Sequence, residues 1–129
     1  MTHSASEETR RRFPKARHLL RHSDFERVYK HGRRHFARHL TVFYLRRTGE
    51  PAVSGLRIGF TVGKVLGKAV ERNRMRRVLR EAARLNGLER ALDVDVVVNP
   101  KKSLLDLDFA EVRSEMGNAL DVIEKSFRI

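Results

Sequence analysis

The sequence has no cysteine, no tryptophan and only three prolines among 129 residues. The lack of cysteine excludes a disulfide scaffold, a zinc site with cysteine ligands and a cysteine nucleophile. No apolar run reaches the roughly 18 residues that a membrane span needs, and the chain starts with polar and acidic residues rather than a basic and then apolar signal. We therefore expect a cytoplasmic protein with no membrane partner, long enough to form one domain with its own core.

Acidic side chains are scarce in the first part of the chain. Residues 1–90 carry 23 basic and 8 acidic side chains, a balance of +15, whereas residues 91–129 have a balance of −3. Of the 28 basic residues 21 are arginine, whose planar guanidinium makes forked contacts with phosphate and stacks on bases. This distribution predicts a polyanionic partner: nucleic acid first, and an anionic membrane surface second.

We expect a flexible basic arm over residues 1–12 and a single RNA-binding α/β domain over residues 13–129. Ser23 and Glu26 have the spacing of a capping box at the start of a short helix, which Gly32 ends.

Alternating apolar residues predict strands over residues 40–45 and 57–62, and these strands can pair as a hairpin with a longer loop. A buried strand is predicted over residues 94–98. The aspartates flanking the C-terminal elements are interpreted as capping and turn residues. They are Asp93, Asp95, Asp106 and Asp108.

The last helix follows Asp108 as its N-cap. Its predicted inner stripe consists of Phe109, Val112, Met116, Leu120, Ile123 and Phe127. Phe60, Phe109 and Phe127 are interpreted as core residues.

A helix over residues 69–85 has an apolar arc and an opposite basic arc. The apolar arc consists of Met75, Val78, Leu79, Ala82 and Leu85; the basic arc consists of Arg72, Arg76, Arg77, Arg80 and Arg84. Solvated helix faces usually alternate Glu with Arg, whereas only Glu81 lies within this basic arc. The pattern favours phosphate binding over a merely solvated face.

The loop before this helix carries Lys64 and Lys68, which lack the spacing of a nucleotide-binding loop but add to the basic surface. Three aromatic residues, Phe25, Tyr29 and Phe43, lie among basic residues. Their sequence context is equally consistent with core packing and with stacking on single-stranded RNA.

No arrangement of residues indicates a catalytic group or a metal site held by the protein. Histidines four apart, such as His18 and His22, lack the Glu of a His-Glu-x-x-His frame and lie in a cationic region. No serine lies in a Gly-x-Ser-x-Gly elbow. We therefore expect no catalytic residue and no metal ligand in this chain.

Residues 67–82 resemble the signature of the protein subunit of bacterial ribonuclease P, in which Arg72-Asn73-Arg74 precedes Arg76, Arg77 and Arg80. The likeness extends over about residues 13–125, including residues 24–33, 57–62 and 95–100. It departs at Asn99, because arginine commonly precedes the proline in that family.

The resemblance implies an α+β sandwich in the order αβββαβα, with a left-handed crossover through the basic helix. It also implies a catalytic RNA subunit that uses Mg²⁺, and a precursor tRNA whose 5′ leader lies in a cleft lined by Phe25, Tyr29 and Phe43. The expected RNA-binding residues are Lys64, Lys68, Arg72, Asn73, Arg74, Arg76, Arg77, Arg80 and Arg84. The expected activity is endonucleolytic removal of the leader by the ribonucleoprotein.

Two alternatives remain at this stage. A ribosomal or other structural RNA-binding protein would share the charge without needing an aromatic leader site. A stand-alone basic nuclease would need a general base such as His35 or Asp95.

Overall fold

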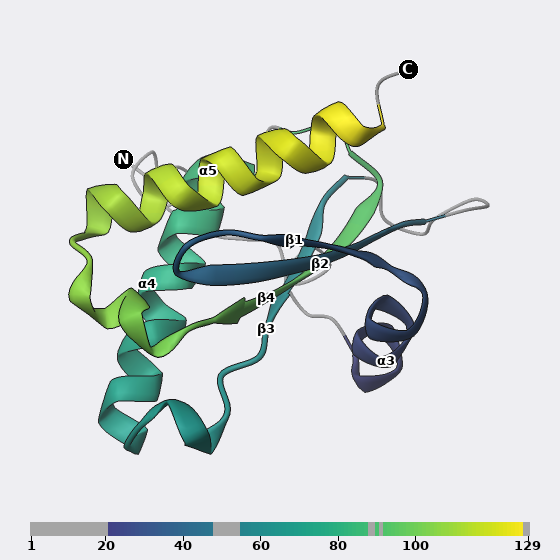
Figure 1. The fold of residues 1–129 in the computed structure, drawn as a ribbon. Coiled ribbons are helices and arrows are strands. Elements are labelled where there is room, and N and C mark those ends of the chain that lie inside the picture. Colours follow the sequence, from purple (N-terminus) through teal and green to yellow (C-terminus); the bar gives the residue numbers. More distant parts are fainter. Residues whose placement is uncertain (1–20, 48–54, 88–89, 91, 128–129) are drawn as a thin grey trace, which may run out of the picture.

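The computed structural model describes residues 21–47, 55–87, 90 and 92–127, so the expected arm over residues 1–12 lies outside the described part. The elements in chain order are α3 (His22–His31), β1 (Arg33–Phe36), β2 (Leu40–Arg46), β3 (Arg57–Phe60), the 3-10 turn η1 (Lys64–Leu66), α4 (Ala69–Gly87), β4 (Val94–Pro100), the 3-10 turn η2 (Lys102–Asp106) and α5 (Phe109–Ser126). This is the expected α+β order (Figure 1). None of the described helices is long and apolar enough to cross a membrane.

The four strands form one mixed sheet in the order β1-β2-β4-β3. β4 pairs antiparallel with β2 and parallel with β3, and α4 provides the crossover between the two parallel strands. The predicted hairpin between residues 40–45 and 57–62 is therefore wrong, because β4 lies between those two strands. Alternation in a sequence shows which face a residue occupies, but it does not show which strand lies alongside.

Helices α4 and α5 cover one face of the sheet (Figure 1). The core between them includes Leu40, Val42, Val96, Val98, Met75, Leu79, Met116, Leu120 and Ile123. Most of the predicted inner stripes are confirmed, with two exceptions. Leu85 is 37% exposed, because it lies at the edge of the α4 face whose centre is formed by the buried side chains of Met75, Leu79 and Ala83. Phe109, the first residue of α5, is 38% exposed and lines a surface hollow.

The short helix α3 lies on the opposite face of the sheet (Figure 1), where the side chain of Val28 is buried outside the main core. The helix begins one residue before Ser23, and the Asp24 carboxylate accepts the Arg21 backbone N–H at 2.9 Å. The predicted capping box of Ser23 and Glu26 is therefore wrong. An acidic side chain three residues after the N-cap satisfies the free N–H there.

Gly32 ends α3 as expected, and its N–H donates to the Val28 carbonyl at 2.8 Å. A Cβ at this position would lie 2.5 Å from that oxygen and 2.6 Å from the Tyr44 carbonyl oxygen. The close approach of α3 to β2 therefore requires glycine.

Candidate nucleic-acid interface

The sheet face toward α3 is organised in rows that cross the strands. One outer row contains Phe36, Thr41 and Asn99, with Thr61 just after the end of β3. The middle row contains Arg34, Phe43, Val97 and Gly59, and the other outer row contains Leu45, Asp95 and Arg57. Because side chains alternate along each strand, every residue in these rows faces the α3 side.

Aromatic rings and a guanidinium meet on this face. Tyr29 of α3 contacts Phe43 of β2 edge to face, with ring centroids 4.9 Å apart. The Arg34 guanidinium lies 5.6 Å from the centroid of Phe43 and 5.8 Å from that of Phe36. Tyr29 is 40% and Phe36 is 66% exposed, so these rings offer stacking surface beside a cation. We call Tyr29, Phe36, Phe43, Thr61 and Asn99 the aromatic face.

Tyr29 is held by hydrogen bonds at its hydroxyl. Its Oη donates to Asn99 Oδ1 at 2.9 Å and lies 2.7 Å from Thr61 Oγ1. Phe25 lies one turn earlier on α3 and is half-buried; within the described residues it has no ring contact with Tyr29 or Phe43. The structure thus brings together two of the three predicted leader-binding aromatics.

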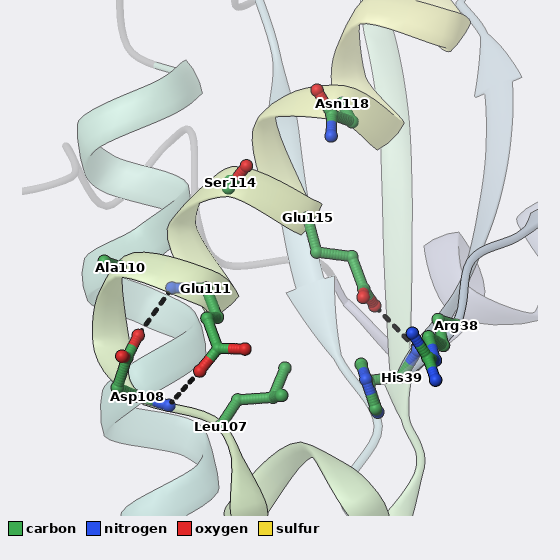
Figure 2. A pocket seen from close by; sticks show the side chains of 9 residues that line it. All are labelled: Arg38, His39, Leu107, Asp108, Ala110, Glu111, Ser114, Glu115 and Asn118. Carbon is green, nitrogen blue, oxygen red and sulfur yellow. Dashed lines mark hydrogen bonds between the residues drawn. The ribbon is translucent and has the colours of Figure 1, made fainter.

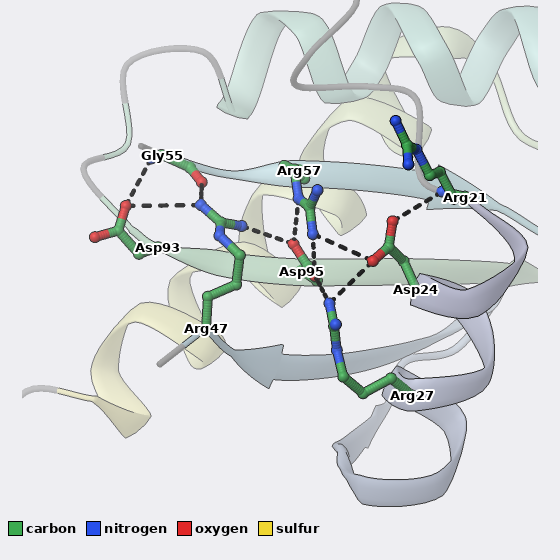
Figure 3. Close-up of polar contacts among 8 residues, drawn as sticks. All are labelled: Arg21, Asp24, Arg27, Arg47, Gly55, Arg57, Asp93 and Asp95. Atoms are coloured by element: carbon green, nitrogen blue, oxygen red, sulfur yellow. Dashed lines mark hydrogen bonds and ion pairs between the residues drawn. The ribbon is translucent and has the colours of Figure 1, made fainter. Parts of the chain in front are cut away.

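A buried carboxylate holds α3 to the sheet next to the aromatic face (Figure 3). Asp95 of β4 is fully buried, and its Oδ1 accepts from Arg57 Nε at 2.7 Å and from Arg47 Nη1 at 2.6 Å. Its Oδ2 accepts from Arg57 Nη2 at 2.7 Å and from Arg27 Nη2 at 2.9 Å. Arg27 also contacts Asp24, so both residues of α3 belong to the same ionic cluster.

Burial by itself raises the pKa of Asp95. The hydrogen bonds and charges of Arg57 and Arg47 outweigh burial and hold this pKa below its usual value. The hydrogen bond to Asp95 correspondingly raises the pKa of Arg57. Asp95 is therefore an ionised, saturated acceptor with all four lone-pair positions occupied.

This geometry corrects the interpretation of Asp95 as a turn residue, since Asp95 lies inside β4. It also removes Asp95 as the general base of a stand-alone nuclease, because a carboxylate held by three guanidinium groups accepts a proton poorly. His35 pairs with Val42 of β2 and lies on the opposite sheet face from Tyr29. Neither proposed base is therefore available at the aromatic face, since Asp95 is saturated by arginine and His35 lies on the other side of the sheet.

The basic arc of α4 divides into exposed and anchored side chains. Exposed members of the predicted RNA-binding set are Lys64, Lys68, Asn73, Arg74, Arg77 and Arg80. The other three are half-buried and bonded to the fold. Arg72 donates to the Gly67 carbonyl at 3.2 Å, and Arg76 donates to the Val62 carbonyl at 3.2 Å and to Asn73 Oδ1 at 3.0 Å.

Arg84 pairs with Glu81, and this hydrogen bond lowers the pKa of Glu81. The charge of Arg84 is thus largely compensated. Fewer side chains of α4 therefore present an unpaired positive charge to solvent than the sequence predicted. Within the described residues, its centre is Arg74, Arg77 and Arg80.

Sequence reasoning missed four residues of the sheet face: Arg34, Phe36, Thr61 and Asn99. Arg34 and Phe36 belong to β1, a strand that the family resemblance implies but that no pattern in the sequence located. Asn99 had a usable signal, because it has the same parity as Asp95 and Val97 along the predicted buried strand. Polar residues such as Asp95 and Asn99 on one side of a predicted buried strand indicate that this side of the sheet is not filled by core residues alone.

The fold also has a hollow of about 450 Å³ between α5 and the β1–β2 turn (Figure 2). Its acidic groups are already used within the fold. Glu115 accepts the His39 backbone N–H at 2.7 Å, and Asp108 and Glu111 cap the start of α5 reciprocally. Asp108 is thus the N-cap that the sequence predicted.

The side chains of the candidate interface do not suit Mg²⁺. Hard cations take oxygen ligands, whereas this surface is built from guanidinium and ammonium groups, and Asp95 is saturated by arginine. The described residues contain no group of three or more potential ligand side chains of the His, Asp and Glu types.

Comparison with known proteins gives one consistent family. A family model described as Ribonuclease P matches residues 13–124. The ribonuclease P protein component of Dictyoglomus thermophilum is 38% identical over 103 residues, which cover 78% of this chain and 82% of that protein. Its counterpart from Clostridioides difficile is 34% identical over 107 residues, covering 82% and 90%.

Solved structures agree with this result. A Staphylococcus aureus RNase P protein mutant with defective mRNA degradation activity superposes with a TM-score of 0.74 at 25% identity, covering 85% of this chain and 90% of the other. The Thermotoga maritima RNase P protein in complex with 1-(4-fluorophenyl)-2-thiourea gives a TM-score of 0.67 at 28% identity, covering 78% and 94%.

Proposed function

The chain belongs to the ribonuclease P protein family and is a protein subunit of the endoribonuclease complex that processes tRNA 5′ ends; from this membership we propose how its surfaces divide the work. The exposed cations of α4 and η1 bind the catalytic RNA, and the aromatic face binds the 5′ leader of precursor tRNA. The RNA subunit supplies the catalysis and holds the Mg²⁺ that the reaction uses. The proposed location is the cytoplasm.

The observation that carries the leader assignment is the contact of Tyr29 and Phe43 beside Arg34. Single-stranded nucleic acid binds where aromatic rings stack on bases and cations meet the backbone. A fully buried aromatic pair would serve the core alone, whereas Tyr29 is 40% exposed. An exposed, oriented ring next to a guanidinium offers both kinds of contact.

Binding of the catalytic RNA is assigned to α4 because this helix exposes cations that have no acidic partner among the described residues. Arg74, Arg77 and Arg80 are exposed, and among the described residues they form no ion pair. Like charges on one helix face repel each other, so a phosphate backbone is the partner that relieves this repulsion. The proposed RNA-binding group keeps Lys64, Lys68 and Asn73, while Arg72 and Arg76 chiefly fix the connection before α4.

The leader site is tested by binding of precursor and mature tRNA to the full-length protein reconstituted with its catalytic RNA. Phe43→Ala removes a stacking ring, and stacking is worth about 1–3 kcal/mol per base. We expect about five- to a hundred-fold weaker binding of precursor tRNA and nearly unchanged binding of mature tRNA. Tyr44→Phe on the opposite sheet face is the control.

Thermal unfolding of each variant precedes the binding measurement, since truncating a buried aromatic residue costs about 3–5 kcal/mol. Equal loss of precursor and mature tRNA by a folded Phe43→Ala variant would refute the leader site. Cleavage of precursor tRNA by the protein without RNA would refute RNA-based catalysis.

A further inference from the structure

A chain of three side chains crosses the outer row of the aromatic face. Tyr29 Oη donates to Asn99 Oδ1, and a carbonyl oxygen only accepts. The single phenolic proton is therefore used in that bond. Thr61, whose Oγ1 lies 2.7 Å from Tyr29 Oη, then donates to the phenol. The order of donation is Thr61 to Tyr29 to Asn99.

In this arrangement the oxygen of the Asn99 amide faces the Tyr29 hydroxyl. With Oδ1 turned toward Tyr29, the Nδ2 amide points away from the phenol. Asn99 is half-buried, and within the described residues its Nδ2 has no hydrogen-bond partner and is not enclosed. The side chain thus presents two N–H donors at the surface, next to the exposed ring of Tyr29 to which Asn99 is hydrogen-bonded.

The neighbours of Asn99 favour a base edge over a phosphate as the acceptor for this amide. The cations nearby have partners of their own: Arg34 is over Phe43 in the middle row, Arg57 is engaged by Asp95, and Lys101 donates through Nζ to the Ala37 carbonyl at 3.1 Å. The side chains around the amide are instead Thr41, Thr61 and the ring of Tyr29. A base that stacks on this ring places its polar edge within reach of a neutral amide.

We propose that Asn99 is a specificity-determining residue of the leader site, whose Nδ2 donates to an acceptor atom on the edge of one unpaired leader base. Tyr29 and Thr61 act as positioning residues that hold the amide in this orientation. Tyr29 uses one of the two lone pairs of Asn99 Oδ1, whereas both Nδ2 donors have no partner among the described residues. The inference rests on the proposed leader site.

The test uses the full-length protein reconstituted with its catalytic RNA and precursor tRNAs in which one leader position at a time carries each of the four bases. One hydrogen bond contributes about 0.5–1.5 kcal/mol, or about two- to tenfold in affinity. We expect the unmodified protein to show such a base dependence at one leader position. Asn99→Leu abolishes this dependence.

Tyr29→Phe separates orientation from stacking, since it keeps the ring and removes only the hydroxyl. We expect overall precursor affinity to stay within about threefold, because a single neutral hydrogen bond is lost, while the base dependence weakens as the amide becomes free to turn. Tyr44→Phe and Asn118→Leu make the same chemical changes away from this face, and both retain the dependence. Mature tRNA affinity and thermal unfolding serve as controls for folding.

Two outcomes overturn the inference: no base dependence at any leader position, or the same dependence in folded Asn99→Leu as in the unmodified protein. Neither outcome affects the leader site itself, which Phe43→Ala tests separately. If Phe43→Ala keeps the preference for precursor over mature tRNA while Asn99→Leu still abolishes the leader-base dependence, stacking of the leader on Phe43 fails as part of the proposed function and the reading of a leader base by Asn99 stands.

Discussion

Arg57 of β3 and Asp95 of β4 lie directly opposite each other in the parallel register and make a two-point contact, with both N···O distances 2.7 Å. The contact fixes both side chains in one plane. Arg27 reaches the same carboxylate from α3 (Figure 3). The position of α3, and with it the position of Tyr29, therefore depends on a carboxylate buried near the start of β4.

Asp95→Asn is expected to lower the free energy of unfolding by about 3–5 kcal/mol, because it leaves guanidinium groups without their buried counter-charge. Urea denaturation of the RNA-free protein measures the effect. Asp93→Asn is the matched control, since the Asp93 side chain is 50% exposed and pairs with Arg47 at 3.7 Å; we expect a loss below about 1 kcal/mol. Similar losses for both variants would contradict the central role of Asp95.

The stability that Asp95 contributes is expected to depend on pH in one direction. Its pKa in the folded protein lies below the ordinary value of 3.8, so the contribution is complete above that value and is lost as the pH falls through the folded pKa. Urea denaturation between about pH 7 and pH 3 should show falling stability below about pH 4. Asp95→Asn should show a shallower acid decline, and an unchanged decline would contradict the assignment.

Replacing both Arg77 and Arg80 with Ala is expected to weaken binding of the catalytic RNA without unfolding the protein, because exposed substitutions change stability by about 0.5 kcal/mol or less. The slope of log affinity against log salt should become shallower by about 0.7–0.9 for each lost phosphate contact. Binding titrations at several salt concentrations measure it. Arg113→Ala with Lys125→Ala removes the same charge from α5, and an equal change of slope there would show a nonspecific effect.

Arg76→Ala is expected to loosen the segment before α4 as well as to remove a charge. Its guanidinium donates to the Val62 carbonyl and to Asn73, and each such bond is worth about 0.5–1.5 kcal/mol. Amide hydrogen exchange over residues 62–67 should be faster in Arg76→Ala than in Arg77→Ala. Equal exchange in the two variants would show that Arg76 is a surface cation, as the sequence alone suggested.

Local patterns in the sequence located every described helix and strand except β1, whose place in the order only the family resemblance implied, and they predicted the two faces of α4 and α5. Met75 and Leu79 recur at helical spacing, and Asp108 precedes a helix that it caps, so short-range geometry was sufficient. The excess of arginine likewise predicted a polyanionic partner, because net charge does not depend on how strands pair.

Only the tertiary structure decided which polar side chains of the sheet are bonded to other parts of the chain. Strand pairing places β4 between β2 and β3, and this turns Asp95 into the partner of Arg27, Arg47 and Arg57 from three other parts of the chain. The same pairing brings Asn99 within a hydrogen bond of Tyr29, 70 positions away. Hydrogen bonds and ion pairs between distant residues depend on strand neighbours and register, which alternation along one strand leaves open.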